Sequence, residues 1–148
     1  MRLKWDADLE TGIRKIDLQH QELIEMINEL DHALKSGDDG HALDRLLPRL
    51  SGYVLFHFGT EEAMFRGDPA LAEHAAVHVC EHREFSMRVA SFKGGAPGER
   101  RENMARLIDY LCNWTVEHIM KTDKDLARRL NGSGPKYAAA GANHCSSA

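Results

Sequence analysis

The nonapeptide HFGTEEAMF, residues 57–65, places a histidine and a glutamate four residues apart among apolar side chains. Residues with this separation share one face of a helix, so His57 and Glu61 are expected to point together toward the buried side. Burying such a polar pair without partners is costly. Imidazole nitrogen and carboxylate oxygen are both metal ligands, so the chemistry that this stretch suggests is metal coordination.

The same feature recurs on the other predicted helices. A single histidine on an apolar stripe is more often a core residue with one hydrogen bond than a ligand. Five histidines and two carboxylates on four stripes are different, because a small domain with a stability of about 5–15 kcal/mol cannot bury them unpaired. We therefore predict a buried metal centre with these candidate ligands: His20, His57, Glu61, His78, His82, His118 and Asp123.

The composition of this ligand set indicates the metal. Seven ligands exceed the needs of one tetrahedral zinc ion, and oxygen and nitrogen donors suit iron. Two octahedral irons could share both carboxylates and one solvent-derived oxygen, while the five imidazoles bind at terminal positions. One position then stays open, so a small ligand is expected to bind at one of two iron ions that an oxo or hydroxo group bridges.

Apolar residues spaced three and four apart predict the elements that hold these side chains. Four helices are expected, at about 17–35, 41–65, 69–92 and 99–130. Pro48 lies inside the second and predicts a kink or a late start there. Asp68 and Pro69 form a cap and first turn for the third. The short connections favour an all-α fold, an up-down-up-down antiparallel four-helix bundle with an N-terminal arm.

The spacing of His118 and Asp123 does not fit a regular helix. Five residues correspond to about 140° around the helix axis, so the two side chains would not share a face. The apolar stripe also slips there by one residue. We therefore predict a π-type widening near residues 118–123, a feature often found at functional sites.

Length and charge restrict the remaining possibilities. The 148 residues suit one domain, residues 1–131, followed by a small, polar tail, 132–148, that is expected to be disordered. A net charge of -4 gives no basic field for nucleic acid or anionic lipid. No apolar run reaches transmembrane length and no signal peptide is evident. Three widely spaced cysteines favour a reduced, cytoplasmic protein.

Four segments together resemble the hemerythrin family, in particular single-domain bacteriohemerythrins, over residues 3 to about 130. They are LKWDADLETGIRKIDLQHQEL, FHFGTEEAM, HVCEHREF and LCNWTVEHIMKTDKDL. The resemblance implies that one iron is held by three histidines and the other by two, with dioxygen binding at the latter. These roles fall on His78, His82 and His118; on His20 and His57; and, for the bridging carboxylates, on Glu61 and Asp123. The candidate pocket walls are Leu23, Phe56, Trp114 and Ile119, and for each of them a place in the plain apolar core is the alternative.

The third helix departs from the family pattern because it carries an additional histidine, His74, four residues before His78. A His74/His78 ligand pair is therefore an alternative. His78/His82 is preferred, because the apolar stripe passes through both and Phe85 follows His82 as in the family. His32, His41 and His144 are expected at the surface, and Trp5 is expected to pack on the bundle.

The function that the resemblance implies is reversible dioxygen binding for storage, delivery or sensing by a non-enzymatic carrier. The expected partners are dioxygen and either an oxygen-using oxidase or nitric oxide, and the protein is expected to be a monomer or weak oligomer. An enzyme that scavenges peroxide or nitric oxide at the same di-iron site is the alternative. Iron storage and a metal-free bundle are two further hypotheses.

Overall fold

The computed structural model describes residues 2–37, 39–92, 95–96 and 98–132. All regular structure within these residues is helical, with two 3₁₀ turns (η1 and η2) and one π-helical turn (η3) besides the α-helices. In chain order the elements are η1 (Ala7–Leu9), α1 (Arg14–Ser36), α2 (Asp39–Phe65), η2 (Pro69–Leu71), α3 (Ala72–Ala90), α4 (Arg100–His118), η3 (Ile119–Asp123) and α5 (Lys124–Leu130).

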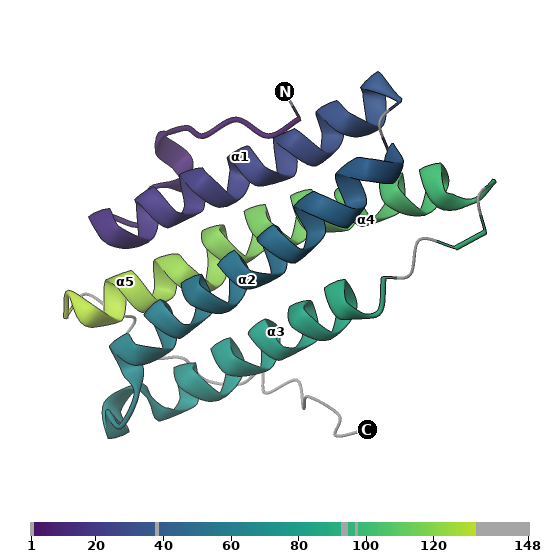
Figure 1. Ribbon diagram of the computed structural model, residues 1–148. Coiled ribbons are helices and arrows are strands. Elements are labelled where there is room, and N and C mark those ends of the chain that lie inside the picture. Colours follow the sequence, from purple (N-terminus) through teal and green to yellow (C-terminus); the bar gives the residue numbers. More distant parts are fainter. Residues whose placement is uncertain (1, 38, 93–94, 97, 133–148) are drawn as a thin grey trace.

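The helices lie side by side, and each begins at the end of the bundle where the preceding one stops (Figure 1). Because η3 joins α4 and α5 without a break, these three elements form the fourth rod. The predicted all-α four-helix bundle is therefore confirmed, with antiparallel neighbours along the chain.

The helix ends follow local sequence signals. α1 stops at Gly37, which adopts φ 82° and directs its backbone N–H to the carbonyls of Ala33 and Leu34. The side chain of Asp68 accepts a hydrogen bond from the backbone N–H of Ala70, so the expected cap is present. α2 begins at Asp39 with Pro48 inside it. Pro48 therefore does not delay the start of this helix.

The interior of the bundle is divided between apolar and polar side chains. One end is filled by the second half of α1, the first half of α2, the end of α3 and the start of α4. The largest buried side chains there include Leu30, Leu50, Phe85, Met104 and Ile108. At the other end a small cluster of Phe65, Leu71 and Leu126 closes the bundle. The candidate ligands lie between these apolar regions.

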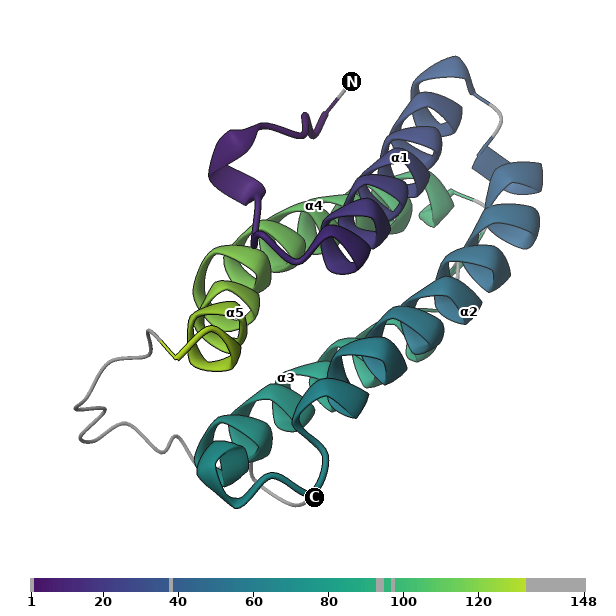
Figure 2. The ribbon, with the colours of Figure 1, turned by 90° about the vertical axis from the view of Figure 1, so that its left-hand side faces the viewer.

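The N-terminal arm packs along α1 and the fourth rod (Figure 2). Leu3, Trp5 and Leu9 contact Ile24 and Ile119, so Trp5 packs on the bundle as expected. The side chain of Asn28 accepts hydrogen bonds from the backbone N–H groups of Arg2 and Leu3 and donates one to the Leu3 carbonyl. These contacts fix the arm beside the buried histidines.

The structure tests the expectations for the cysteines and for the C-terminal tail only in part. Cys112 is a buried, free thiol, as expected for a reduced cysteine. Residues 133–148 of the expected disordered tail, including His144, lie outside the described residues. None of the helices in the described part is long and apolar enough to cross a membrane.

Candidate metal centre

Every helical rod contributes at least one of the seven predicted ligands. α1 supplies one histidine, α2 a histidine and the glutamate, α3 two histidines, and the fourth rod a histidine and the aspartate. No side chain of this set is more than 4% exposed, so water does not solvate these polar groups. The set that the structure brings together is His20, His57, Glu61, His78, His82, His118 and Asp123.

The π-helical turn η3 places Asp123 on the same side of the rod as His118. Asp123 Oδ1 lies 3.0 Å from His118 Nε2, although five positions separate the two residues. A wider turn accommodates the additional residue that a regular α-helical turn would carry round to another face. The predicted widening near residues 118–123 is therefore confirmed.

The two oxygens of Glu61 face different histidines. Oε1 lies 3.5 Å from His57 Nε2 and 3.7 Å from His20 Nε2. Oε2 lies 3.1 Å from His82 Nε2 and 3.4 Å from His78 Nε2. The carboxylate of Glu61 therefore lies between His20 and His57 on one side and His78 and His82 on the other.

Asp123 divides its oxygens in the same way. Oδ2 lies 3.0 Å from His20 Nε2, whereas Oδ1 lies 3.0 Å from His118 Nε2 and 3.2 Å from His78 Nε2. The centre thus has two parts, which we term the two-histidine half (His20 and His57) and the three-histidine half (His78, His82 and His118). Glu61 and Asp123 each reach both halves.

Nε2 of His82 and Nε2 of His118 lie 3.2 Å apart, within hydrogen-bonding distance, but most of the other inward-facing atoms lack hydrogen-bond partners within the described residues. This holds for both oxygens of Glu61, both oxygens of Asp123, and Nε2 of His20 and of His78. The donor atoms nevertheless lie within 4.8 Å of one another in two groups that share Glu61. Converging donor atoms, most of which form no hydrogen bond with one another, fit coordination of cations between them, because ligation satisfies their lone pairs.

Acidic groups orient two of the three outward nitrogens of the three-histidine half. His82 Nδ1 lies 3.0 Å from Glu62 Oε1, and His118 Nδ1 lies 2.6 Å from Glu81 Oε2. Glu81 also accepts a hydrogen bond from the hydroxyl of Thr122. Such contacts hold a ligand ring with its other nitrogen directed at the metal and increase its basicity.

The two-histidine half has weaker outer support. His57 Nδ1 lies 2.9 Å from the amide oxygen of Gln19, a neutral acceptor. His20 Nδ1 has no hydrogen-bond partner among the residues that the structure describes. The ring of Trp5 lies nearby at a centroid distance of 6.3 Å.

The charges of the centre balance one another. Burial alone lowers the pKa of a histidine, and it lowers that of His57 to about 4. In His20 and His118 the facing carboxylates, chiefly Asp123, outweigh burial and raise the pKa to about 9 and about 10 respectively. Despite burial, the surrounding imidazoles hold the pKa of Glu61 and of Asp123 below the ordinary range. The carboxylates are therefore ionised and attract positive charge into the bundle.

Aromatic rings cover the three-histidine half. Phe58 stacks on His82 with centroids 3.7 Å apart, and Trp114 stacks on His118 at 4.3 Å. Phe56 does not line the centre, because its side chain is 58% exposed, and the prediction of Phe56 as a pocket wall is wrong. Phe58 packs against the centre instead, since it lies four residues after the buried Val54 and on the same face of α2.

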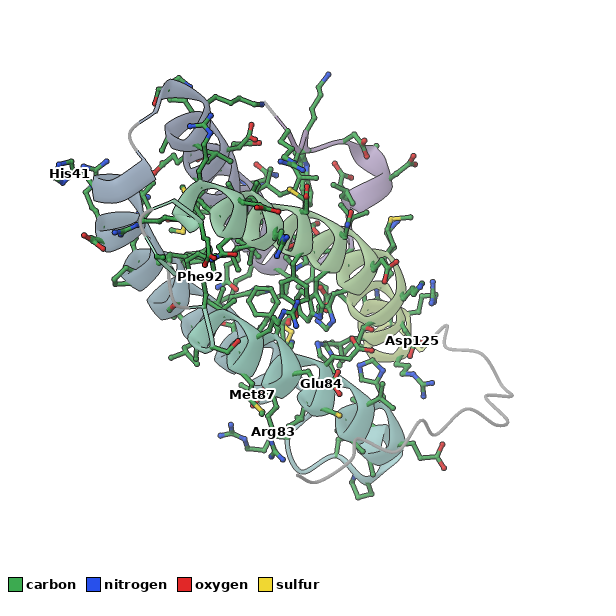
Figure 3. All side chains as sticks on the ribbon, turned by 90° about the vertical axis from the view of Figure 1, so that its right-hand side faces the viewer. His41, Arg83, Glu84, Met87, Phe92 and Asp125 are labelled. Atoms are coloured by element: carbon green, nitrogen blue, oxygen red, sulfur yellow. The ribbon has the colours of Figure 1, made fainter. Side chains whose placement is uncertain are left out.

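The remaining histidines lie outside the cluster. His32 and His41 are exposed, as expected, and His41 projects from the far end of the bundle (Figure 3). His74 is buried, but it contacts Nδ1 of His78 from behind and lies outside both groups of donor atoms. Sequence reasoning missed the outer residues Gln19, Glu62 and Glu81. Each stands next to a predicted ligand in the chain but contacts a ligand on another helix, so adjacency in the sequence is only a weak signal for them.

The chain is similar to known proteins over most of its length. The family model of the hemerythrin HHE cation-binding domain matches residues 11–130. A bacteriohemerythrin of Pseudomonas aeruginosa (strain LESB58) is 31% identical over 126 residues, which cover 82% of this chain and 76% of the relative. One of Stenotrophomonas maltophilia (strain R551-3) is 30% identical over 92% of this chain and 86% of its own length. Myohemerythrin-1 of Phascolopsis gouldii is 28% identical over 80% and 87%.

Proposed function

The chain belongs to the hemerythrin family, and on that premise we propose that it binds dioxygen reversibly at a centre of two iron ions. The observation that carries this proposal is the division of Glu61 and Asp123, whose two oxygens face opposite halves of the cluster. Carboxylates so placed suit two metal ions side by side, with an oxo or hydroxo group between them.

The chain's own residues would hold the two irons unequally. His78, His82 and His118 would bind one, and His20 and His57 the other, while both carboxylates bridge them. The iron pair supplies the two electrons that reversible dioxygen binding requires. The two-histidine half contributes one protein ligand fewer, so it offers the open position for a small ligand.

The side chains around the centre favour reversible binding of dioxygen rather than its enzymatic turnover. Leu23 and Ile119 are at most 2% exposed, and Trp114 covers His118 with its ring. A dry, apolar surrounding of this kind limits the access of water and protons to a bound ligand. We propose that Leu23, Phe58, Trp114 and Ile119 form this surrounding and that the protein acts as a carrier.

Iron content and absorption spectra test the proposal. The reduced protein is measured without oxygen, after oxygen is admitted, and after oxygen is removed. Two irons per chain, with charge-transfer bands that appear and disappear with oxygen, are the expected result. Irreversible oxidation accompanied by turnover of peroxide or nitric oxide would indicate a scavenging enzyme instead, and many irons per chain would indicate storage.

A further inference from the structure

A chain of contacts leads from the three-histidine half to the edge of the bundle. His74 Nε2 lies 3.0 Å from His78 Nδ1, and His74 Nδ1 lies 2.9 Å from Asp125 Oδ2. The side chain of Arg129 donates to the same aspartate oxygen at 2.6 Å. Figure 3 shows Asp125 on the fourth rod, where α5 lies beside α3. His78 is thus the one inward-facing histidine whose outer partner is itself a histidine.

His74 is enclosed by protein. It is 7% exposed, and the ring of Phe65 packs against it with centroids 5.9 Å apart. Both of its ring nitrogens have a partner, one toward the centre and one toward Asp125. The partners of its two nitrogens therefore limit which protons the neutral ring can carry.

The direction of the hydrogen bonds follows from Asp125. An ionised carboxylate only accepts, so Nδ1 of His74 carries a hydrogen and donates it to Asp125. In the neutral ring Nε2 is then an acceptor, and His78 Nδ1 must donate to it. This leaves a lone pair on His78 Nε2, the atom that faces Glu61 and Asp123. The opposite tautomer of His78 would place a hydrogen where a metal ion has to bind.

We propose that His74, held by Asp125, is a positioning residue that fixes the ring orientation and tautomer of His78 for metal binding. The proposal rests on the function proposed above, because it requires His78 to be a ligand. Glu62 and Glu81 act directly on His82 and His118. For His78 the imidazole of His74 spans the distance between the ligand and the carboxylate of Asp125.

The test compares His74→Leu with His74→Gln in the full chain, reconstituted with Zn²⁺ as a diamagnetic probe. The amide oxygen of Gln can accept the hydrogen of His78 Nδ1, whereas Leu fills the space without an acceptor. Loss of an outer partner of a metal ligand typically reduces affinity about 10–100-fold. We expect that loss in His74→Leu and near-complete rescue in His74→Gln. The exposed His41→Leu serves as the matched control.

Long-range ¹H–¹⁵N NMR spectra provide a readout that a purely structural role would not change. In the wild-type Zn²⁺ form both His74 and His78 should be protonated at Nδ1. Asp125→Leu, which changes a residue at the bundle edge, should weaken Zn²⁺ binding in the same direction and mix the tautomers of His74. This second variant tests the proposal even if His74→Leu does not fold.

The outcomes separate the two proposals. If wild-type protein does not bind two metal ions, the proposed function fails and the role of His74 fails with it. If wild type binds two ions but His74→Leu binds Zn²⁺ equally well, the positioning role alone is wrong. Equal loss in His74→Leu and His74→Gln would also overturn it, because acceptance of the His78 hydrogen would then not be the property that matters.

Discussion

The two halves of the centre have similar inward faces and different outer surroundings. In the three-histidine half, Glu62, Glu81 and the His74–Asp125 pair hold every outward nitrogen. In the two-histidine half, a neutral amide holds His57 and no described residue bonds Nδ1 of His20. A carboxylate that accepts a hydrogen bond from one imidazole nitrogen makes the other nitrogen a stronger metal ligand and fixes the orientation of the ring. We therefore expect the three-histidine half to hold a metal ion more firmly than the two-histidine half.

Removal of one histidine from each half should cause the largest losses of stability and of bound metal, and the two losses should differ. His118→Ala leaves the buried Asp123 without its imidazole at 3.0 Å and also releases Glu81. Loss of one partner from a buried pair costs about 3–5 kcal/mol, and the metal should be lost as well. His20→Ala should cost less, because the outward nitrogen of His20 makes no hydrogen bond within the described structure. Urea denaturation and metal analysis measure both, and equal losses would contradict the difference between the halves.

Exchange of the outer partners should change the metal affinity of the two halves in opposite directions. Glu81→Gln removes the charge that holds His118 and should weaken metal binding about tenfold or more. Gln19→Glu places a charge behind His57 and should strengthen binding in the two-histidine half. Competition of Co²⁺ with a chelating dye measures both affinities. Shifts of both variants in the same direction would show that the charge of the outer partner does not distinguish the halves.

Metal binding should release protons from both halves. At pH 7.5 His20 and His118 are protonated in the metal-free protein, because their pKa is raised to about 9 and about 10. Both must deprotonate to bind a metal, so affinity should fall as the pH is lowered from about 10, the pKa of His118. His57, whose pKa is lowered to about 4, should contribute no proton. Calorimetry in buffers with different ionisation enthalpies counts the protons, and binding without proton release would disprove this charge assignment.

Phe56→Ala should have the smallest effect. The side chain of Phe56 is exposed and contacts Tyr53, so its removal should change the free energy of unfolding by no more than about 0.5 kcal/mol. The absorption spectrum and the rate of irreversible oxidation should also stay unchanged. Faster oxidation of Phe56→Ala would show that Phe56 does shield the two-histidine half.

The inward ligands could be predicted from the sequence because each lies on the apolar stripe of one helix. The distance from His118 to Asp123 even predicted the irregular turn, since a helix has a fixed rotation per residue. Phe56 was assigned wrongly although the spacing from Val54 favoured Phe58. The neighbours of a ligand in the chain lie about 100° to either side of it, so proximity in sequence does not identify the packed ring.

The outer partners could not be predicted in the same way, because they act between helices. Glu81 stands beside His82 in the sequence but orients His118 on another rod. His74 was recognised as an unusual additional histidine, yet its contact with Asp125 depends on the rotation of α5 relative to α3. Periodicity defines the buried face of one helix and leaves the register between two helices open.

The turn η3 also sets which insertions and deletions the chain can tolerate. Because it holds one residue more than a regular turn, α4 and α5 bury their side chains in different phases along one rod. Deletion of Met120 or Lys121, both exposed, would rotate α5 by about 100° relative to α4. Asp123, Asp125 and Leu126 would then all lose their present contacts. An alignment of relatives should therefore allow gaps between α3 and α4 and none between His118 and Asp123.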